Sequence, residues 1–196
     1  MEHANSSKDN NKKKLLLHIC CAPCSTSVIL QLSPEYDAYG FFYNPNIDIE
    51  QEYKYRKSEM KKIANIYNVP VIYGEYDVEK WRESVKGLED EPEGARRCEV
   101  CFRKRLKKTA QVAMKKGFDL FCTTLTVSPL KNANLINRIG KEIEQETGCI
   151  YLESNFKKKD GFKKSVELSK KYNLYRQDYC GCSFSKREVG VGRREK

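Results

Sequence analysis

The sequence predicts a single α/β domain with a mostly parallel sheet. Short apolar runs that are typical of buried strands alternate with longer charged segments that carry apolar residues at helical spacing. With 196 residues, 39% hydrophobic and 33% charged, the chain suits one globular domain with a solvated surface. We assign residues 14–196 to a single catalytic domain with a C-terminal C-G-C segment. Residues 1–13, "MEHANSSKDNNKK", are expected to form a disordered polar tail.

Five apolar runs are expected to be the strands, in the order 14–20, 38–44, 69–76, 119–127 and 149–154. The first, "KLLLHIC", is almost continuously apolar, as strands covered on both faces are. The fourth, "DLFCTTLTV", is rich in β-branched residues, which favour strands. Strands separated by helices predict parallel pairing, because parallel strands need a long crossover connection.

Helices are expected between these strands. The first, which contains "SVILQL", should start after Ser25, whose hydroxyl suits an N-cap. The others are expected at 49–67, at 95–117 with Gly117 as the C-cap, at 132–148 and at 162–173. In such folds ligands bind beyond the carboxyl ends of the strands. The cysteines that follow the first strand therefore lie at a functional position.

Composition limits the classes of function. No window approaches the roughly 18 apolar residues of a membrane span, and the N-terminus lacks the apolar centre of a secretory signal, so we expect a cytoplasmic protein without membrane contact. In a reducing compartment, clustered cysteines bind metals or perform redox chemistry more often than they form structural disulfides. The net charge of +10 favours nucleic acid as a partner, although a lysine-rich solvated surface would give the same value.

The first two cysteine groups together supply the ligands of a metal centre. "HICCAPCS" holds Cys20, Cys21 and Cys24, and "RRCEVCFRKR" holds Cys98 and Cys101 at the start of a basic helix. Helix N–H groups and arginines favour thiolates there. Two cysteines from each group make four ligands, as an iron–sulfur cluster or a closed zinc site requires. Adjacent cysteines suit separate irons of a [4Fe–4S] cluster better than one zinc ion. A chance buried pair and a thiol–disulfide exchange pair are the alternatives for the second group.

The third group is "DYCGCSFS", in which Cys180 and Cys182 flank Gly181. A disulfide across one glycine would be strained, and strained disulfides exchange readily, so the pair is interpreted as a two-electron store near a chain terminus, where it can move. A metal-binding C-x-C is the competing interpretation. The remaining cysteines, Cys122 and Cys149, lie singly in apolar strands and are expected in the core.

Taken together, the motifs resemble one family. "HICCAPCS", "FFYNPNI" with "EYKYR", "RRCEVCFRKRL", "FCTTLTVSPLKN" and "YRQDYCGCSFS" occur in this order over roughly residues 14–187. This set resembles the QueH-type epoxyqueuosine reductases. The resemblance implies a fold similar to the adenine nucleotide α-hydrolase and PP-loop group, with "CCAPCS" in place of the pyrophosphate-binding loop.

The resemblance also implies an activity and its residues. Such enzymes reduce the epoxide of epoxyqueuosine to the alkene of queuosine in a tRNA anticodon loop, without cobalamin. Carried over to this sequence, Cys20, Cys21, Cys98 and Cys101 bind a [4Fe–4S] cluster, and Cys180 and Cys182 form a redox-active pair. Family members have been described with a second iron beside the cluster, for which Cys24 is the candidate ligand.

The expected partners are tRNA and an electron donor that the sequence does not identify. The basic helix after Cys101 and the run Lys157–Lys159 are expected to hold tRNA phosphates. One rival hypothesis is a zinc-stabilised RNA-binding module without catalysis. Another is a thiol oxidoreductase that acts on proteins without any metal.

Overall fold

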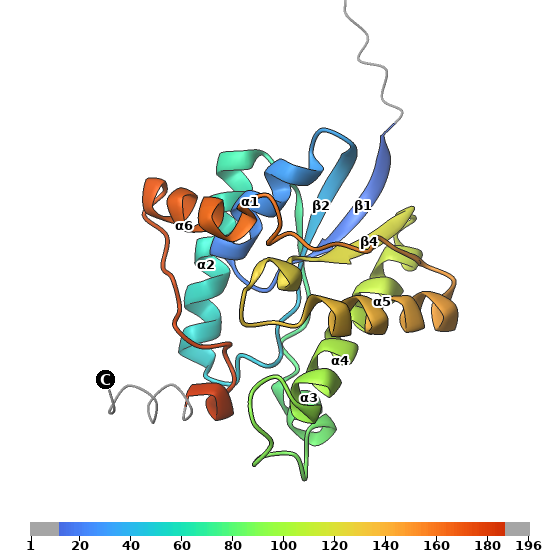
Figure 1. Cartoon of the computed structure of the whole chain (residues 1–196), viewed down its shortest axis with the longest axis vertical. Coiled ribbons are helices and arrows are strands. Elements are labelled where there is room, and N and C mark those ends of the chain that lie inside the picture. Colours follow the sequence, from blue (N-terminus) through green and yellow to red (C-terminus); the bar gives the residue numbers. More distant parts are fainter. Residues whose placement is uncertain (1–11, 187–196) are drawn as a thin grey trace, which may run out of the picture.

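The fold is a five-stranded parallel sheet between two layers of helices. It is described from a computed structural model, for residues 12–186 (Figure 1). Every neighbouring pair of strands is parallel, in the order β3-β2-β1-β4-β5. The strands are β1 (Lys13–His18), β2 (Tyr36–Phe42), β3 (Val71–Tyr73), β4 (Leu120–Thr123) and β5 (Ile150–Tyr151). The predicted α/β class and parallel sheet are confirmed.

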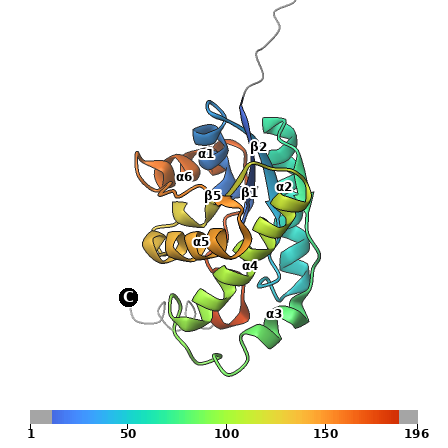
Figure 2. The ribbon, with the colours of Figure 1, turned by 90° about the vertical axis from the view of Figure 1, so that its right-hand side faces the viewer.

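Six α-helices and one 3-10 helix connect and cover the strands in this part of the chain. They are α1 (Ala22–Leu32), α2 (Glu50–Tyr67), α3 (Val78–Ser84), α4 (Arg96–Lys115), η1 (Thr124–Val127), α5 (Ala133–Thr147) and α6 (Gly161–Lys171). Helices α1, α2 and α6 pack on one face of the sheet, whereas α4 and α5 pack together on the other (Figure 2).

The central strand β1 separates two apolar cores. Leu15 and Leu17 point into the core beneath α1, α2 and α6, whereas Leu16 points into the core beneath α4 and α5. All three are at most 1% exposed. Successive side chains of a strand point to opposite faces, so a run of leucines fills both cores at once. This fixes β1 in the middle of the sheet and its carboxyl end at the centre of the sheet edge.

Two local predictions are wrong, and one helix was missed. The predicted fourth strand, 119–127, is a strand only to Thr123 and continues as the 3-10 helix η1, because the Thr123 hydroxyl accepts a hydrogen bond from the Leu125 N–H and turns the backbone. Ser25 is not an N-cap: it lies inside α1, and its hydroxyl donates to the Ala22 carbonyl at 2.8 Å. Helix α3 was not predicted.

The described part of the chain begins just before β1. Lys13 already pairs in β1, and residues 1–11 of the predicted disordered tail lie outside the described residues. Residues 187–196 also lie outside them. Between these ends, no helix combines the length and the apolar character needed to span a bilayer.

Candidate functional site

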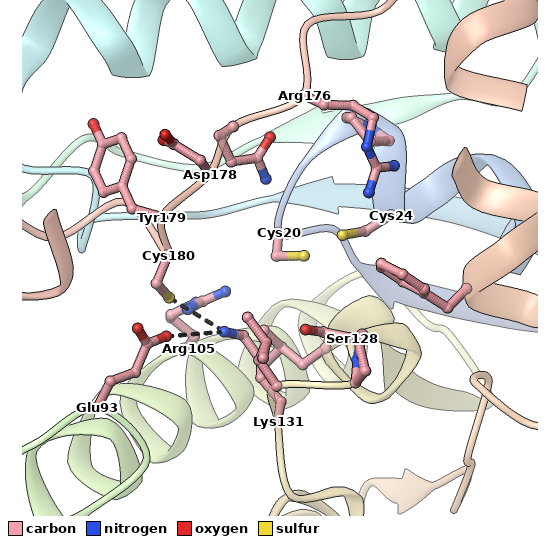
Figure 3. Close-up of a pocket in the computed structure, with 16 residues that line it drawn as sticks. Cys20, Cys24, Glu93, Arg105, Ser128, Lys131, Arg176, Asp178, Tyr179 and Cys180 are labelled. Atoms are coloured by element: carbon pink, nitrogen blue, oxygen red, sulfur yellow. Dashed lines mark hydrogen bonds and ion pairs between the residues drawn. The ribbon is translucent and has the colours of Figure 1, made fainter. Parts of the chain in front are cut away.

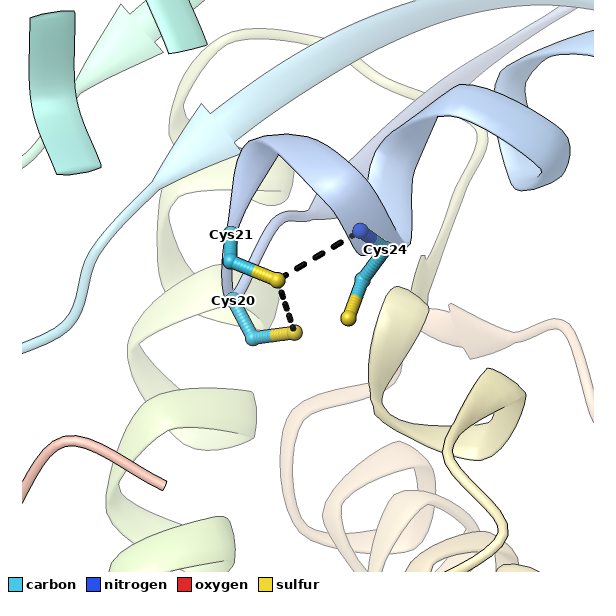
Figure 4. A group of neighbouring side chains, drawn as sticks. All are labelled: Cys20, Cys21 and Cys24. Atoms are coloured by element: carbon cyan, nitrogen blue, oxygen red, sulfur yellow. Dashed lines mark hydrogen bonds between the residues drawn. The ribbon is translucent and has the colours of Figure 1, made fainter. Parts of the chain in front are cut away.

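Three thiols meet at the carboxyl end of β1. The sulfur atoms of Cys20, Cys21 and Cys24 all lie within 4.8 Å of one another, and those of Cys20 and Cys21 are 3.9 Å apart (Figure 4). β1 ends two residues before Cys20, and α1 begins directly after Cys21, so the strand-to-helix turn directs all three side chains to one side. Three convergent thiols could bind a metal ion.

Cys21 has a second role as the N-cap of α1. Its sulfur accepts a hydrogen bond from the Cys24 backbone N–H at 3.4 Å, as the oxygen of a serine or aspartate cap would. The helix begins here rather than at Ser25 because Pro23 fits the first turn, where its missing N–H costs nothing. The helix N-terminus therefore directs its partial positive charge at the cysteine group.

Negative charge in the group concentrates on Cys20. Hydrogen bonds from the Cys21 and Cys24 thiols hold the pKa of Cys20 well below its usual value, with further help from Arg105 and Thr124. Burial, and the thiolate of Cys20, raise the pKa of Cys21 to about 12. The group therefore carries one thiolate with two neutral thiols around it, which suits metal capture because the thiolate is the ligand form.

Thr124 of η1 fixes the orientation of Cys20. Its hydroxyl oxygen accepts from the Cys20 N–H at 3.0 Å and its hydroxyl proton points to the Cys20 sulfur at 3.2 Å. The turn from β4 into η1 brings this hydroxyl next to the end of β1, since the two strands are neighbours. Sequence reasoning did not identify Thr124; its place just after a strand was the available signal.

The second pair, Cys98 and Cys101, lies in the first two turns of α4. Both side chains are buried, at 8% and 6% exposure, and the Gly94 N–H donates to the Cys98 sulfur at 3.2 Å. Burial raises the pKa of Cys98 to about 12. The two residues lie three positions apart on α4 and therefore share one face of the helix, as their spacing predicts.

Arg105 connects the cysteine groups. Its guanidinium is 1% exposed, donates to the Cys101 sulfur at 3.8 Å, and interacts electrostatically with Cys20, Cys101 and Cys180. His18 Nε2 lies 3.4 Å from Arg105 Nε and 3.2 Å from the Tyr43 carbonyl oxygen, and His18 Nδ1 lies 2.8 Å from the Thr123 hydroxyl. His18 is thus a hydrogen-bonded core residue, as expected. A buried cation requires nearby negative charge, and Cys20, whose pKa is lowered, is a thiol that can supply it here.

The C-G-C segment is anchored rather than left as a loose tail. Arg56 of α2 donates to the carbonyls of Cys180 and Tyr179, at 3.1 and 3.4 Å, and is itself paired with Glu52. Asp48 accepts from the backbone N–H and the hydroxyl of Ser183, at 2.9 and 2.7 Å. Buried Arg56 and half-buried Asp48 thus hold the backbone of residues 179–183 in this structure, and its movement during reaction stays a prediction.

Cys180 and Cys182 point to different surroundings. All nine cysteines of the chain are free thiols. Cys182 is 6% exposed and packs against Cys101 and Trp81, whereas Cys180 lines an open cavity. Cys122 and Cys149 are buried in the core at 0% and 4% exposure, as predicted.

Thiols from the N-terminal and the C-terminal parts of the chain line one cavity. It has a volume of about 280 Å³ and is lined by Cys20 and Cys24 on one side and by Cys180 on the other (Figure 3). Lys131, from the loop between η1 and α5, extends into it and donates to the Cys180 sulfur at 3.4 Å. Lys131 lies in the motif "VSPLKN", to which sequence reasoning gave no role.

Several basic side chains of the helix α4 are paired or buried. Arg103 forms ion pairs with Glu142 and Glu146 of α5, and Lys107 pairs with Glu146 at 2.8 Å. Arg105 points into the protein. In the run 157–159, Lys158 and Lys159 are exposed, whereas Lys157 donates to the Lys131 carbonyl at 2.8 Å. Part of the positive charge of α4 is thus neutralised by α5 at the surface, and part is buried.

Comparison with known proteins gives the family. The family model described as "Epoxyqueuosine reductase QueH" matches residues 15–188. The chain belongs to the QueH family. A QueH epoxyqueuosine reductase of Thermotoga maritima is 44% identical over 185 residues, which cover 93% of each chain. Its counterparts in Staphylococcus epidermidis and Streptococcus pyogenes serotype M1 are 40% and 39% identical, over 94% of this chain and 81% and 74% of theirs.

QueH membership explains the cysteine-rich edge of the sheet. Identity near 40% over almost the whole described chain makes this protein an oxidoreductase of queuosine biosynthesis. The resemblance drawn from the motifs is confirmed. In this QueH protein, the triad of Cys20, Cys21 and Cys24 is the group of thiols whose geometry is suited to a metal.

Proposed function

We propose that the chain reduces epoxyqueuosine to queuosine in the anticodon loop of tRNA, at the cavity between Cys20 and Cys180. The observation that carries this proposal is the convergence of thiols from two ends of the sequence on one cavity. A volume of about 280 Å³ is close to the lower limit for small-molecule sites and suits one modified nucleobase substituent. The family name supplies the reaction, and the convergent thiols are a fitting redox centre.

Within this site, Cys20, Cys21, Cys98 and Cys101 are the proposed ligands of a [4Fe–4S] cluster. Two observations fit an anionic, sulfur-rich group there. Arg105 is a buried cation that interacts with thiols of both pairs. The indole N–H of Trp81, which packs against Cys101, is buried and has no hydrogen-bond partner among the described residues. Cluster sulfurs accept N–H hydrogen bonds of this kind.

When bound, such a cluster supplies single-electron transfer. Cys24 is the third thiol of the triad and is the proposed ligand of a second iron ion. The cytoplasm is the proposed location, because a reducing compartment keeps such thiols free.

Cys180 and Cys182 are proposed as the redox-active pair. Reduction of the epoxide to an alkene consumes two electrons and two protons and releases the oxygen as water. Oxidation of two thiols to one disulfide releases two electrons and two protons, so the pair balances one turnover. An external electron donor then restores the thiols. Arg56 and Asp48 hold the backbone on either side of Gly181 and so keep Cys180 at the cavity.

The tRNA is proposed to approach from the side of α6 and the loop before it. Arg176, Tyr179 and Phe162 line the mouth of the cavity, and Lys158 and Lys159 are exposed on the preceding loop. Aromatic faces stack on splayed bases, and arginine and lysine contact phosphates. This assignment replaces the α4 surface as the proposed tRNA contact.

The test is anaerobic reconstitution with iron and sulfide, followed by metal analysis and an assay of epoxyqueuosine in tRNA. We expect Cys98→Ala to lose iron, sulfide and conversion. Cys182→Ser should keep both elements and lose conversion. Cys149→Ala, a cysteine of the core, is the matched control and should behave as the wild type does.

Other outcomes decide against the proposal. A full iron and sulfide content in Cys98→Ala would remove Cys98 from the ligand set. Zinc in place of iron, with no conversion, would support the zinc-stabilised RNA-binding module. Thiol exchange on proteins without metal would support the thiol oxidoreductase.

A further inference from the structure

Lys131 is a charged side chain in hydrogen-bond contact with the Cys180 thiol in this cavity. Its Nζ lies 3.4 Å from the Cys180 sulfur and 3.8 Å from a carboxylate oxygen of Glu93, and its side chain is 12% exposed (Figure 3). The Phe102 ring lies beneath the ammonium, 6.0 Å from Nζ. These contacts direct the ammonium into the cavity beside Cys180, where the substrate oxygen must also lie if Cys180 reacts.

We propose that Lys131 is the proton donor of the site: its ammonium pairs with Cys180 in the resting enzyme and passes an Nζ–H proton to the epoxide oxygen as the C–O bond breaks. The inference rests on the role proposed for Cys180. An epoxide opens to an alkoxide unless its oxygen is protonated, and a positioned acid contributes about 10²–10⁴-fold in rate. Among the residues lining the cavity, Lys131 is a cation in direct contact with a proposed redox thiol.

The step balances with the groups already present. The Nζ–H bond of Lys131 breaks and an O–H bond forms on the substrate oxygen. Two electrons come from Cys180 and Cys182, which become joined by an S–S bond. Of the two thiol protons released, one returns Lys131 to the ammonium form and the other completes the water molecule. Two thiols and one epoxide thus give one disulfide, one alkene and one water.

The charges around Lys131 determine when it gives up its proton. Burial alone would lower the pKa of Lys131, but Cys180, Glu93 and Cys20 outweigh it and raise the pKa above its ordinary value, against the opposing charge of Arg105. Lys131 therefore holds its proton while Cys180 is reduced. Once Cys180 is part of the disulfide, its contribution to the pKa of Lys131 is lost, and the ammonium becomes a stronger acid.

Two variants separate proton donation from charge. Lys131→Arg keeps the cation next to Cys180 but cannot release a proton at neutral pH. Lys131→Ala removes both the cation and the proton donor. We expect each to lower the single-turnover rate by about 10²-fold or more. Ethylamine at high concentration should restore at least 10-fold of the rate to Lys131→Ala and nothing to Lys131→Arg. Lys115→Met, at the far end of α4, is the matched control and should keep the wild-type rate.

A second measurement tests the contact without any turnover. Cys180 is alkylated at one pH with iodoacetate and with iodoacetamide, and the site of modification is located by mass spectrometry. The ammonium attracts the anionic reagent, so the ratio of the two rates should fall in Lys131→Ala and persist in Lys131→Arg. The ratio compares reagents at the same thiol, so the ionisation of that thiol cancels.

The outcomes distinguish the two proposals. An unchanged reagent ratio in Lys131→Ala would overturn the contact, whether or not the enzyme turns over. A wild-type rate in Lys131→Arg would overturn proton donation. Failure of the wild type to convert epoxyqueuosine would instead overturn the proposed function, and with it the proton transfer that rests on it.

Discussion

At the scale of single residues, the site depends on backbone groups that bring side chains from distant elements together. Gly181 is the clearest case. Its φ of +126° is a conformation that side-chain-bearing residues rarely adopt. A Cβ atom there would lie 2.9 Å from Ile47 and 3.2 Å from the Arg56 guanidinium. The glycine is therefore required both by its backbone angle and by lack of space.

Gly181→Ala should displace Cys180 from the cavity. We expect the free energy of unfolding to fall by about 1–3 kcal/mol, as at overpacked sites. We expect the rate of epoxyqueuosine conversion to fall by a larger fraction than the stability does. Urea unfolding and the tRNA assay measure the two effects. Gly87→Ala is the control for the cost of placing a side chain at a positive φ, because Gly87 has a φ of +80° and nothing within 4 Å of the added carbon. Equal loss of conversion in both variants would contradict the specific role of Gly181.

Arg56 gives a second prediction at this scale. It is 2% exposed, pairs with Glu52 at 2.7 Å and donates to two carbonyls of the C-G-C segment. Arg56→Met removes the cation that pairs with Glu52, whose carboxylate still accepts from the Tyr175 hydroxyl, and removes the Arg56 donor from both carbonyls, so we expect destabilisation of about 3–5 kcal/mol. Arg56→Lys keeps the charge but not the fork of donors, and should be more stable than Arg56→Met yet poor in conversion. Full conversion by Arg56→Lys would contradict the anchoring role.

Sequence reasoning found the cysteines and missed most of their partners. Cys20, Cys98 and Cys180 were identifiable because their spacing and their places after a strand or at a helix start indicate chemistry. Thr124 and Lys131 were not identified, because threonine and lysine are common outside functional sites, and the place of Thr124 just after a strand was the one local signal. Their roles arise only when the sheet places the end of β4 beside the end of β1.

At the scale of elements, long amphipathic helices were predictable and turns were not. The helices α2, α4 and α5 lie close to their expected ranges, because helical periodicity over many residues is a strong signal. The start of α1 was misplaced because a cysteine, rather than Ser25, caps it. A thiol that binds an N–H group is uncommon, and propensity rules for caps favour oxygen.

The short edge strand β5 supplies the pH-dependent prediction. The Glu144 carboxylate accepts from Lys141 Nζ at 2.9 Å and from the Tyr151 N–H of β5 at 3.0 Å, and these bonds lower the pKa of Glu144 below its usual value. The unfolded chain therefore takes up this proton at a higher pH than the folded chain does. The stabilisation is present above the ordinary pKa of a glutamate and is lost as the pH falls through the lower, folded pKa.

Glu144→Gln should remove this contribution. At neutral pH we expect the variant to be less stable than the wild type by about 0.5 kcal/mol, as for partly exposed ion pairs. The difference should shrink as the pH falls below about 4, where the wild-type carboxylate becomes protonated. Urea midpoints from pH 7 to pH 3 measure it. Lys141→Met should show the same trend more weakly, and a difference that grows in acid would contradict the assignment.

At the scale of the whole molecule, some of the basic side chains that give the excess positive charge are held in ion pairs, and others are exposed. The net charge is +10, but Arg103 and Lys107 are paired across α4 and α5, whereas Lys158 and Lys159 are exposed on the loop before α6. Composition correctly suggested a nucleic-acid partner for the family's tRNA reaction. It could not say which lysines are free, because pairing between two helices depends on how they pack.

Salt dependence of tRNA binding tests this distribution. Each phosphate contact contributes about 0.7–0.9 to the slope of log affinity against log salt concentration. We expect the double variant Lys158→Ala with Lys159→Ala to reduce the slope by about 1.4–1.8. Lys107→Ala, whose partner is Glu146, should change it little. Filter binding over a salt series gives both slopes, and a larger change for Lys107→Ala would return the contact to α4.

The closure of the site by the C-G-C segment has a consequence for biogenesis. A ribosome completes β1 and its cysteine triad first, α4 with Cys98 and Cys101 later, and Cys180 last. Until that final segment emerges and docks against Arg56, the earlier thiols lack their cover. The order of synthesis thus leaves an interval in which these thiols are open to solvent, before the C-G-C segment docks beside them.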